Sequence, residues 1–133
     1  MENRNERIFD FCDKKKNFFV ASVFGAKQFI TFYILHLLST NPMYGEAISK
    51  NVSELLSNLW QPSPGFIYPI LKRLERHGLL KGEWDYTETH PRYLYKLTDK
   101  GKEEYAKYKE VFSTKLDELV VVLNKVRNEI FDK

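Results

Sequence analysis

The sequence predicts a mainly helical α+β domain that ends in a long helix. Three observations support this fold class: three segments with helical apolar spacing, two short strand-like runs after them, and a last apolar stripe that continues almost to the C-terminus. The chain has 133 residues, and one domain usually takes roughly 100–200 residues. We therefore expect one compact domain and no two-domain enzyme.

The composition is that of an ordinary soluble protein. Hydrophobic residues make up 43% and charged residues 29%, and the mean hydropathy of −0.47 excludes a chain that lives mainly in lipid. The net charge of +3 allows an anionic partner without requiring one. Aromatic residues, at 15%, exceed what a minimal core needs, so some are expected on a surface that meets another molecule. The single cysteine, Cys12, excludes an internal disulfide and a multi-cysteine metal site and favours a cytoplasmic protein.

Residues 1–28 are predicted to form an N-terminal helical extension. Their apolar residues recur at approximately helical spacing: Ile8, Phe11, Cys12, Phe19 and Val23. The lysine run at 14–16 before apolar residues superficially resembles a signal peptide, but the leader is also acidic and has no clear cleavage site. A membrane span is disfavoured because Lys27 would lie near mid-bilayer, which costs about 2.5–3.5 kcal/mol.

Two helices are expected next. Residues 29–38 are nearly all apolar, form a run longer than most strands, and end at turn residues 39–42, which favours a buried helix. A second, shorter helix is predicted from Gly45 to Leu59. Its apolar residues follow one another at intervals of three and four: Ile48, Val52, Leu55, Leu56 and Leu59.

The third helix is predicted to begin at Pro64, with Ser63 as its cap. Proline suits the first helical position because the N–H that it lacks would have been unpaired there, and Gly78 supplies the stop. The buried stripe is expected to consist of Ile67, Ile70, Leu71 and Leu74. The opposite face carries Gly65, Pro69, Lys72 and Arg76. One face is therefore expected in the core, and the other is basic.

A β-hairpin and a long helix complete the chain. Residues 79–86 and 92–97 read as two strands joined by the turn at 87–91. Thr98 and Asp99 can cap a helix from about Lys100 to Phe131. At about 1.5 Å per residue this helix would be longer than about 40 Å, more than one small globule can cover. Its apolar stripe therefore predicts a partner chain.

Three helices followed by a hairpin, with a basic third helix, is the order of elements in a winged helix-turn-helix. Three local patterns are more specific: Pro-x-(His/Tyr)-Gly-x-x-Ile at 42–48, Tyr-Pro-x-Leu-x-Arg-Leu-Glu at 68–75, and Tyr-x-Leu-Thr-x-x-Gly at 95–101. Together they closely resemble the PadR family of transcriptional regulators, over roughly residues 34–101. The chain departs from the common pattern by Tyr44, where many relatives have His, and by its N-terminal extension.

The resemblance implies a homodimeric DNA-binding repressor of the subgroup with a short C-terminal part. The third helix would enter the major groove, the hairpin would lie against adjacent backbone, and the C-terminal helices would form the dimer. The expected division is a helical extension at 1–28, a winged helix-turn-helix at 29–101 and a dimerisation helix at 102–133. The predicted dimerisation residues are Tyr108, Phe112, Leu116, Leu119, Leu123, Val126 and Ile130.

The third helix also has the physical properties of a DNA-reading element. The major groove, about 12 Å wide, admits one helix. The N-terminus of this helix offers free N–H groups to phosphate, the Tyr68 hydroxyl can donate to phosphate, and basic side chains can reach phosphates or guanine edges. Arg73 and Arg76 could instead be solvated or paired with acids such as Glu75. The predicted DNA-binding residues are Ser63, Pro64, Gly65, Tyr68, Lys72, Arg73, Arg76 and Arg92.

Other aromatic and histidine residues favour structural roles. Tyr93 and Tyr95 are expected to pack in the sheet and core. Trp60 is expected to pack at the junction before the third helix, and Trp84 to be half-buried on a strand, with stacking on a flat effector as the alternative. His36 is expected to be a satisfied core group.

The predicted function is a transcriptional regulator, most simply a repressor, that binds double-stranded DNA in a sequence-specific way. A homodimer would bind a pseudo-palindromic operator with half-sites about 10–10.5 bp, or a multiple, apart. The alternative is a protein-interaction module that keeps the fold without binding DNA. The chain lacks a Gly-rich phosphate loop, a nucleophile elbow and metal-ligand spacing, so neither an enzyme nor a cofactor is expected. The sequence leaves open whether a small-molecule effector exists.

Overall fold

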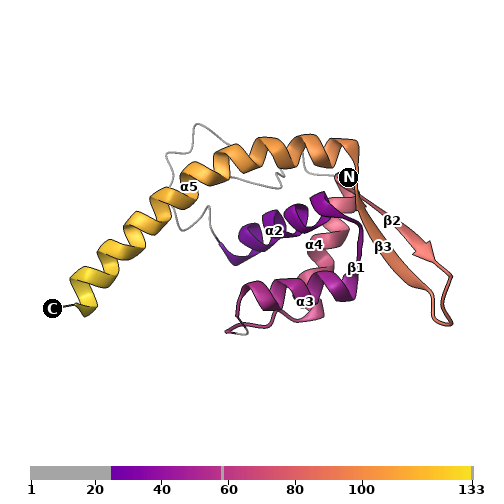
Figure 1. Cartoon of the computed structure of the whole chain (residues 1–133), viewed down its shortest axis with the longest axis horizontal. Coiled ribbons are helices and arrows are strands. Elements are labelled where there is room, and N and C mark those ends of the chain that lie inside the picture. Colours follow the sequence, from indigo (N-terminus) through magenta and orange to yellow (C-terminus); the bar gives the residue numbers. More distant parts are fainter. Residues whose placement is uncertain (1–24, 58, 133) are drawn as a thin grey trace.

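The structure, a computed structural model, describes residues 25–57 and 59–132. These residues form four helices and a small sheet in the order α2 (Ala26–Thr40), β1 (Met43–Tyr44), α3 (Gly45–Leu55), α4 (Pro64–Arg76), β2 (Leu80–Asp85), β3 (Arg92–Leu97) and α5 (Asp99–Phe131) (Figure 1). This mainly helical α+β architecture confirms the winged helix-turn-helix fold. The predicted N-terminal extension lies outside the described residues, apart from 25–28, of which 26–28 belong to α2.

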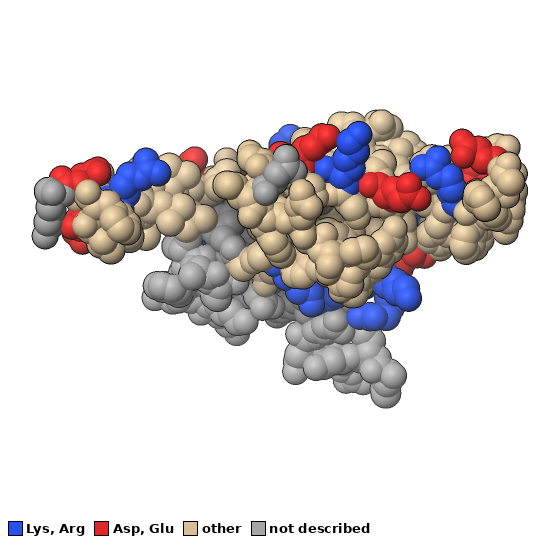
Figure 2. Space-filling model, turned by 90° about the horizontal axis from the view of Figure 1, so that it is seen from below, with Lys and Arg blue, Asp and Glu red and all other residues tan. Residues whose placement is uncertain are grey.

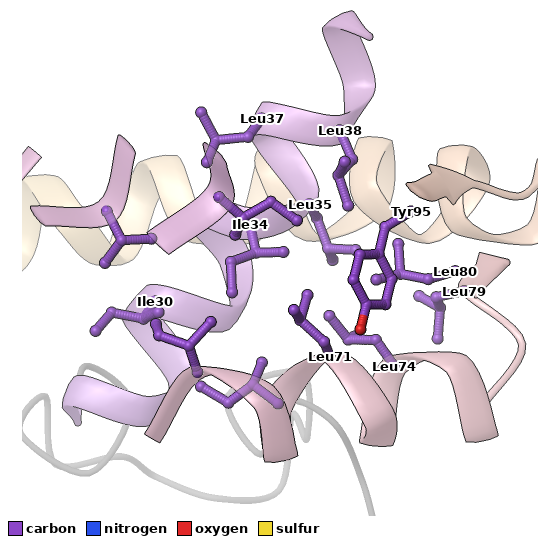
Figure 3. Packing of buried hydrophobic residues seen from close by; sticks show 14 of the residues in the cluster. Ile30, Ile34, Leu35, Leu37, Leu38, Leu71, Leu74, Leu79, Leu80 and Tyr95 are labelled. Carbon is purple, nitrogen blue, oxygen red and sulfur yellow. The ribbon is translucent and has the colours of Figure 1, made fainter. Parts of the chain in front are cut away.

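The core lies where α2, α3 and α4 meet the inner face of the sheet. Figure 3 shows leucine side chains of α2 and α4 packed beside the ring of Tyr95, with the isoleucines of α2 farther along the same cluster. Tyr95 is therefore a core residue, as predicted. The buried stripe predicted for α4 is also confirmed: Ile67, Ile70, Leu71 and Leu74.

The beginning of α4 differs in detail from the prediction. Pro64 occupies the first turn and Ser63 is the N-cap residue, but its side chain makes no cap hydrogen bond. The Ser63 carbonyl closes the turn instead, accepting the N–H groups of Phe66 at 2.9 Å and Ile67 at 3.2 Å. The proline already sets the backbone for the helix, so the turn does not depend on the hydroxyl. At the other end Gly78 has φ of +78°, a conformation that glycine adopts at little cost.

The second helix is shorter than the sequence predicts. α3 ends at Leu55 rather than at Leu59. Ser57 has φ of 54°, outside the right-handed helical region, so the helix cannot continue through it. Leu59 consequently leaves the apolar face of α3 and is exposed.

The sheet contains a strand that was not predicted. β1 pairs antiparallel with β3, and β3 pairs antiparallel with β2, in the order β1-β3-β2. We call β2, β3 and the residues 86–91 between them the wing. The pairs Trp84↔Tyr93 and Gly82↔Tyr95 share the inner face of the sheet, whereas Asp85↔Arg92 lies on the outer face.

The long helix α5 has two differently placed parts. Thr98 caps it by accepting the Gly101 N–H at 2.9 Å, as predicted. Its first part packs along α2, where Phe112 stacks on Phe32 with ring centroids 4.3 Å apart. Its last part extends away from the rest of the described chain (Figure 1). None of the described helices combines the length and apolarity needed to cross a membrane.

Candidate nucleic-acid interface

The exposed face of α4 carries the residues that the sequence placed there. Gly65, Pro69, Lys72 and Arg76 are all exposed, and a Cβ added to Gly65 would meet only the Ser63 hydroxyl, at 3.6 Å. Ser63 and Pro64 are exposed as well. The N-terminus and one side of α4 can therefore approach a surface closely.

Two predicted contact residues on α4 are less accessible. Arg73 is half-buried, so Lys72 and Arg76 are the exposed cations of this helix. Tyr68 is half-buried too, and a Cβ added to Gly45 would lie 2.7 Å from its hydroxyl oxygen. Tyr68 therefore packs against the start of α3, and its phosphate contact stays a prediction.

Arg92 is held on the outer face of the wing. Its guanidinium lies 3.8 Å above the centre of the Tyr44 ring and 3.9 Å from the Glu88 carboxylate. The Tyr44 hydroxyl in turn donates to the carboxylate of Asp85. This bond raises the pKa of Tyr44 and, together with donation from Thr87, lowers the pKa of Asp85 to about 2. The cluster joins β1 to both wing strands and orients Arg92.

The rest of the wing is close to electrically balanced. Glu83 lies 3.7 Å from the Lys81 ammonium and 3.4 Å from that of Lys96. On the face shown in Figure 2, basic and acidic side chains form separate small patches. A wing with so little net charge would add little attraction for a polyanion, so most of any such attraction would have to come from the exposed cations of α4.

A hydrogen bond braces the wing against α4. The Tyr93 hydroxyl donates to the Glu75 carboxylate at 2.9 Å, which raises the pKa of Tyr93. The sequence placed Tyr93 in the sheet but gave no sign of this link, because the two residues are eighteen positions apart. The wing and the candidate reading helix are therefore fixed relative to each other.

The two tryptophans and His36 lie in different surroundings. Trp60 packs edge-on against Phe66 with centroids 5.1 Å apart, at the helix junction as predicted. Trp84 is 58% exposed, more than the half-buried position expected. The placement of His36 in the core is wrong: its ring is exposed, although its Nδ1 is paired with the Tyr105 hydroxyl at 2.7 Å. His36 lies on the side of α2 that faces α5, away from the buried stripe.

The predicted dimerisation stripe is divided between two environments. Phe112, at 4% exposure, belongs to the core of its own chain, and Tyr108 packs against that core. Leu119 is half-buried. The other predicted residues are exposed in the single chain: Leu116, Leu123, Val126 and Ile130. Between residues 25 and 132, leaving out residue 58, no group of three or more potential ligand residues could hold a metal ion.

Known proteins share both this sequence and this fold. Residues 34–107 match the transcriptional regulator PadR-like family. The transcriptional regulator Rv3488 of Mycobacterium tuberculosis is 33% identical over 73 residues, which are 55% of this chain and 65% of Rv3488. The chain therefore spans just under two thirds of that relative's length.

Solved structures extend the comparison. A transcriptional regulator from Clostridium thermocellum has 27% identity and a TM-score of 0.58, over 77% of this chain and 93% of that one. Bacillus subtilis PadR, solved in complex with operator DNA, has 30% identity and a TM-score of 0.54, over 60% of this chain and 45% of that one. The matched family consists of transcriptional regulators, which are not enzymes. On the match of residues 34–107 and on the winged helix built from them, the chain belongs to the PadR-like family of transcriptional regulators.

Proposed function

We propose that this protein is a sequence-specific DNA-binding repressor that acts as a homodimer on a pseudo-palindromic operator. The observation that carries the proposal is the two-sided character of α4. Four aliphatic side chains anchor one side in the core, while Lys72 and Arg76 are exposed on the other. A helix buried on one side and cationic on the other suits the major groove.

The proposed contacts are of two kinds: contacts to phosphate that position the protein on DNA, and contacts to bases that read the sequence. The N-terminus of α4, at Ser63, Pro64 and Gly65, presents helix N–H groups to a phosphate. Lys72 and Arg76 extend from the exposed side toward phosphates or guanine edges, and each good bidentate base contact adds about 1–3 kcal/mol of discrimination. The similarity of this fold to Bacillus subtilis PadR, which was solved with operator DNA, supports the same class of ligand here.

The exposed part of α5 supports the homodimer. Beyond Phe112, large aliphatic residues are exposed, including Leu123 at 56% and Ile130 at 63%. An exposed apolar stripe of this length on a protruding helix is typical of a surface that pairs with another chain. A twofold dimer would present two copies of α4 to one duplex.

The salt dependence of DNA binding tests this function. Replacing Lys72 by Ala should weaken binding and reduce the slope of log K against log salt concentration by about 0.9, as expected for one lost phosphate contact. The exposed Lys107 on α5 is the matched control, and its replacement by Ala should leave the slope unchanged. Equal slopes for the wild type and Lys72→Ala would reject the phosphate contact.

The alternative, a protein-interaction module without DNA binding, is distinguished by the wild-type chain. A groove-binding protein should bind duplex DNA of random sequence with a Kd of roughly 10⁻⁴–10⁻⁶ M at physiological salt. A gel shift or anisotropy titration at low salt detects such binding. No binding under these conditions would reject the proposed function in favour of the alternative.

A further inference from the structure

An aromatic cleft lies between α4 and the wing. It is an open depression of about 420 Å³, lined by side chains from both elements: Lys72, Glu75, Trp84, Tyr93 and Tyr95. Trp84 is the exposed aromatic residue among them. An exposed indole beside a lysine offers both an apolar surface and a cation to whatever enters the cleft.

The indole of Trp84 is held in place by its neighbours. The ring of Tyr93 lies across Gly82, where an added Cβ would come within 2.1 Å of it. From this position the Tyr93 hydroxyl reaches Glu75 on α4. Trp84 packs edge-on against the same ring, with centroids 5.0 Å apart. Its surface is therefore ordered before any ligand binds, which reduces the entropy lost on binding.

We propose that this cleft receives the sugar–phosphate strand that separates the major from the minor groove, and that Trp84 is a DNA-contacting residue. The inference rests on the proposed function. When a helix occupies the major groove and the adjoining wing lies toward the next groove, the strand between the grooves must pass between helix and wing. The cleft lies at that place, and Lys72 belongs both to it and to the exposed side of α4.

The chemistry of the cleft matches that strand. Deoxyribose has an apolar surface that packs against an indole, and the indole Nε1–H donates to a phosphate oxygen. Lys72 supplies a cation from the helix side. The acid in the cleft, Glu75, already accepts the Tyr93 hydroxyl and lies one helical turn from Lys72. Contacts to sugar and phosphate do not read the base sequence, so Trp84 adds affinity to every duplex alike.

Substitution of Trp84 provides the first test. In an anisotropy titration with labelled duplex DNA, Trp84→Ala should weaken binding about tenfold for operator and random sequences alike. The slope against log salt should stay unchanged, because no cation is removed. Trp84→Phe, which keeps an apolar ring but loses the N–H, should fall between. The control is Thr89→Ala, an exposed wing residue outside the cleft lining, which should retain wild-type affinity.

Fluorescence of the unaltered Trp84 provides a second test that does not depend on how Trp84→Ala folds. The chain has two tryptophans, so Trp60→Phe leaves Trp84 as the sole reporter. Its accessibility to acrylamide should fall when duplex DNA binds. If the wild type binds DNA but Trp84 stays as accessible to acrylamide as before, or if Thr89→Ala weakens binding as much as Trp84→Ala, the assignment is overturned and the proposed function stands. Absence of DNA binding by the wild type would overturn both.

Discussion

Replacing Gly82 by Ala should break the brace between the wing and α4. The new Cβ would lie 2.1 and 2.2 Å from two ring carbons of Tyr93 and 2.3 Å from its hydroxyl oxygen, well inside van der Waals contact. The ring cannot share that space, so it must rotate away from the inner face of the sheet. Tyr93 then loses its hydrogen bond to Glu75 and its edge-on contacts with Trp84 and Tyr95.

The size of this effect follows from the interactions lost. A hydrogen bond to a charged group contributes about 1.5–3 kcal/mol, and each aromatic pair about 0.5–1.5 kcal/mol. Tyr93 and Glu75 are half-buried, which favours the lower values. Alanine in a strand offsets about 0.5–1 kcal/mol of the loss. We expect the free energy of unfolding to fall by about 1.5–2 kcal/mol.

A double-mutant cycle in urea denaturation tests the reasoning. Gly82→Ala and Tyr93→Ala should each destabilise the protein, whereas Gly82→Ala added to Tyr93→Ala should cost almost nothing, because the obstructing ring is gone. Gly65→Ala is the control, since its Cβ would meet only the Ser63 hydroxyl at van der Waals distance. If Gly82→Ala is as costly without the Tyr93 ring as with it, the explanation is wrong.

Three further predictions concern the outer face of the wing, the dimer and the core. Tyr44→Phe should raise the pKa of Asp85 from about 2 toward its ordinary value of 3.8, measured by NMR titration. Because folding lowers the pKa of Asp85, its ionised carboxylate stabilises the wild-type fold fully above the pKa of the unfolded chain, and this stabilisation is lost as the pH falls through about 4 to 2. The free energy of unfolding of Tyr44→Phe should fall less over the same pH range. Leu123→Lys should convert the proposed dimer to a folded monomer in sedimentation at micromolar concentration, and a retained dimer would refute this interface. Phe112→Ala should reduce the free energy of unfolding by about 3–5 kcal/mol, since the ring is buried and stacked on Phe32, and a loss below 1 kcal/mol would contradict that packing.

The features of the fold that were predicted correctly are those that depend on residues close together in the sequence. The start of α4 depends on Pro64, its end on Gly78, and its buried stripe on aliphatic spacing, all of which are readable within a few residues. β1 escaped prediction because Met43 and Tyr44 show no alternation and form a strand only through pairing with β3. Nonlocal pairing of this kind leaves no trace in a two-residue segment.

Periodicity identified apolar faces but not their partners. The stripe of α5 is continuous in sequence, yet Phe112 packs against Phe32 of the same chain whereas Leu123 is exposed. Alternation in β2 puts Trp84 on the inner face of the sheet, but it cannot say whether anything covers that position. In both cases the sequence does not show how far the core of the folded chain extends, and so it does not show which of these apolar residues the core covers.

The junction between α4 and α5 connects the proposed reading and dimerisation elements. A Cβ on Gly101 would lie 2.2 Å from the backbone oxygen of Leu79, so only glycine lets the first turn of α5 pack this closely. Thr98 donates to the Gly78 carbonyl at 2.6 Å, and the Lys100 ammonium donates to the His77 carbonyl at 2.8 Å. These bonds attach the start of α5 directly to the end of α4. In the proposed homodimer, the angle at which two α5 helices cross therefore sets the separation of the two α4 helices, and with it the spacing of the half-sites.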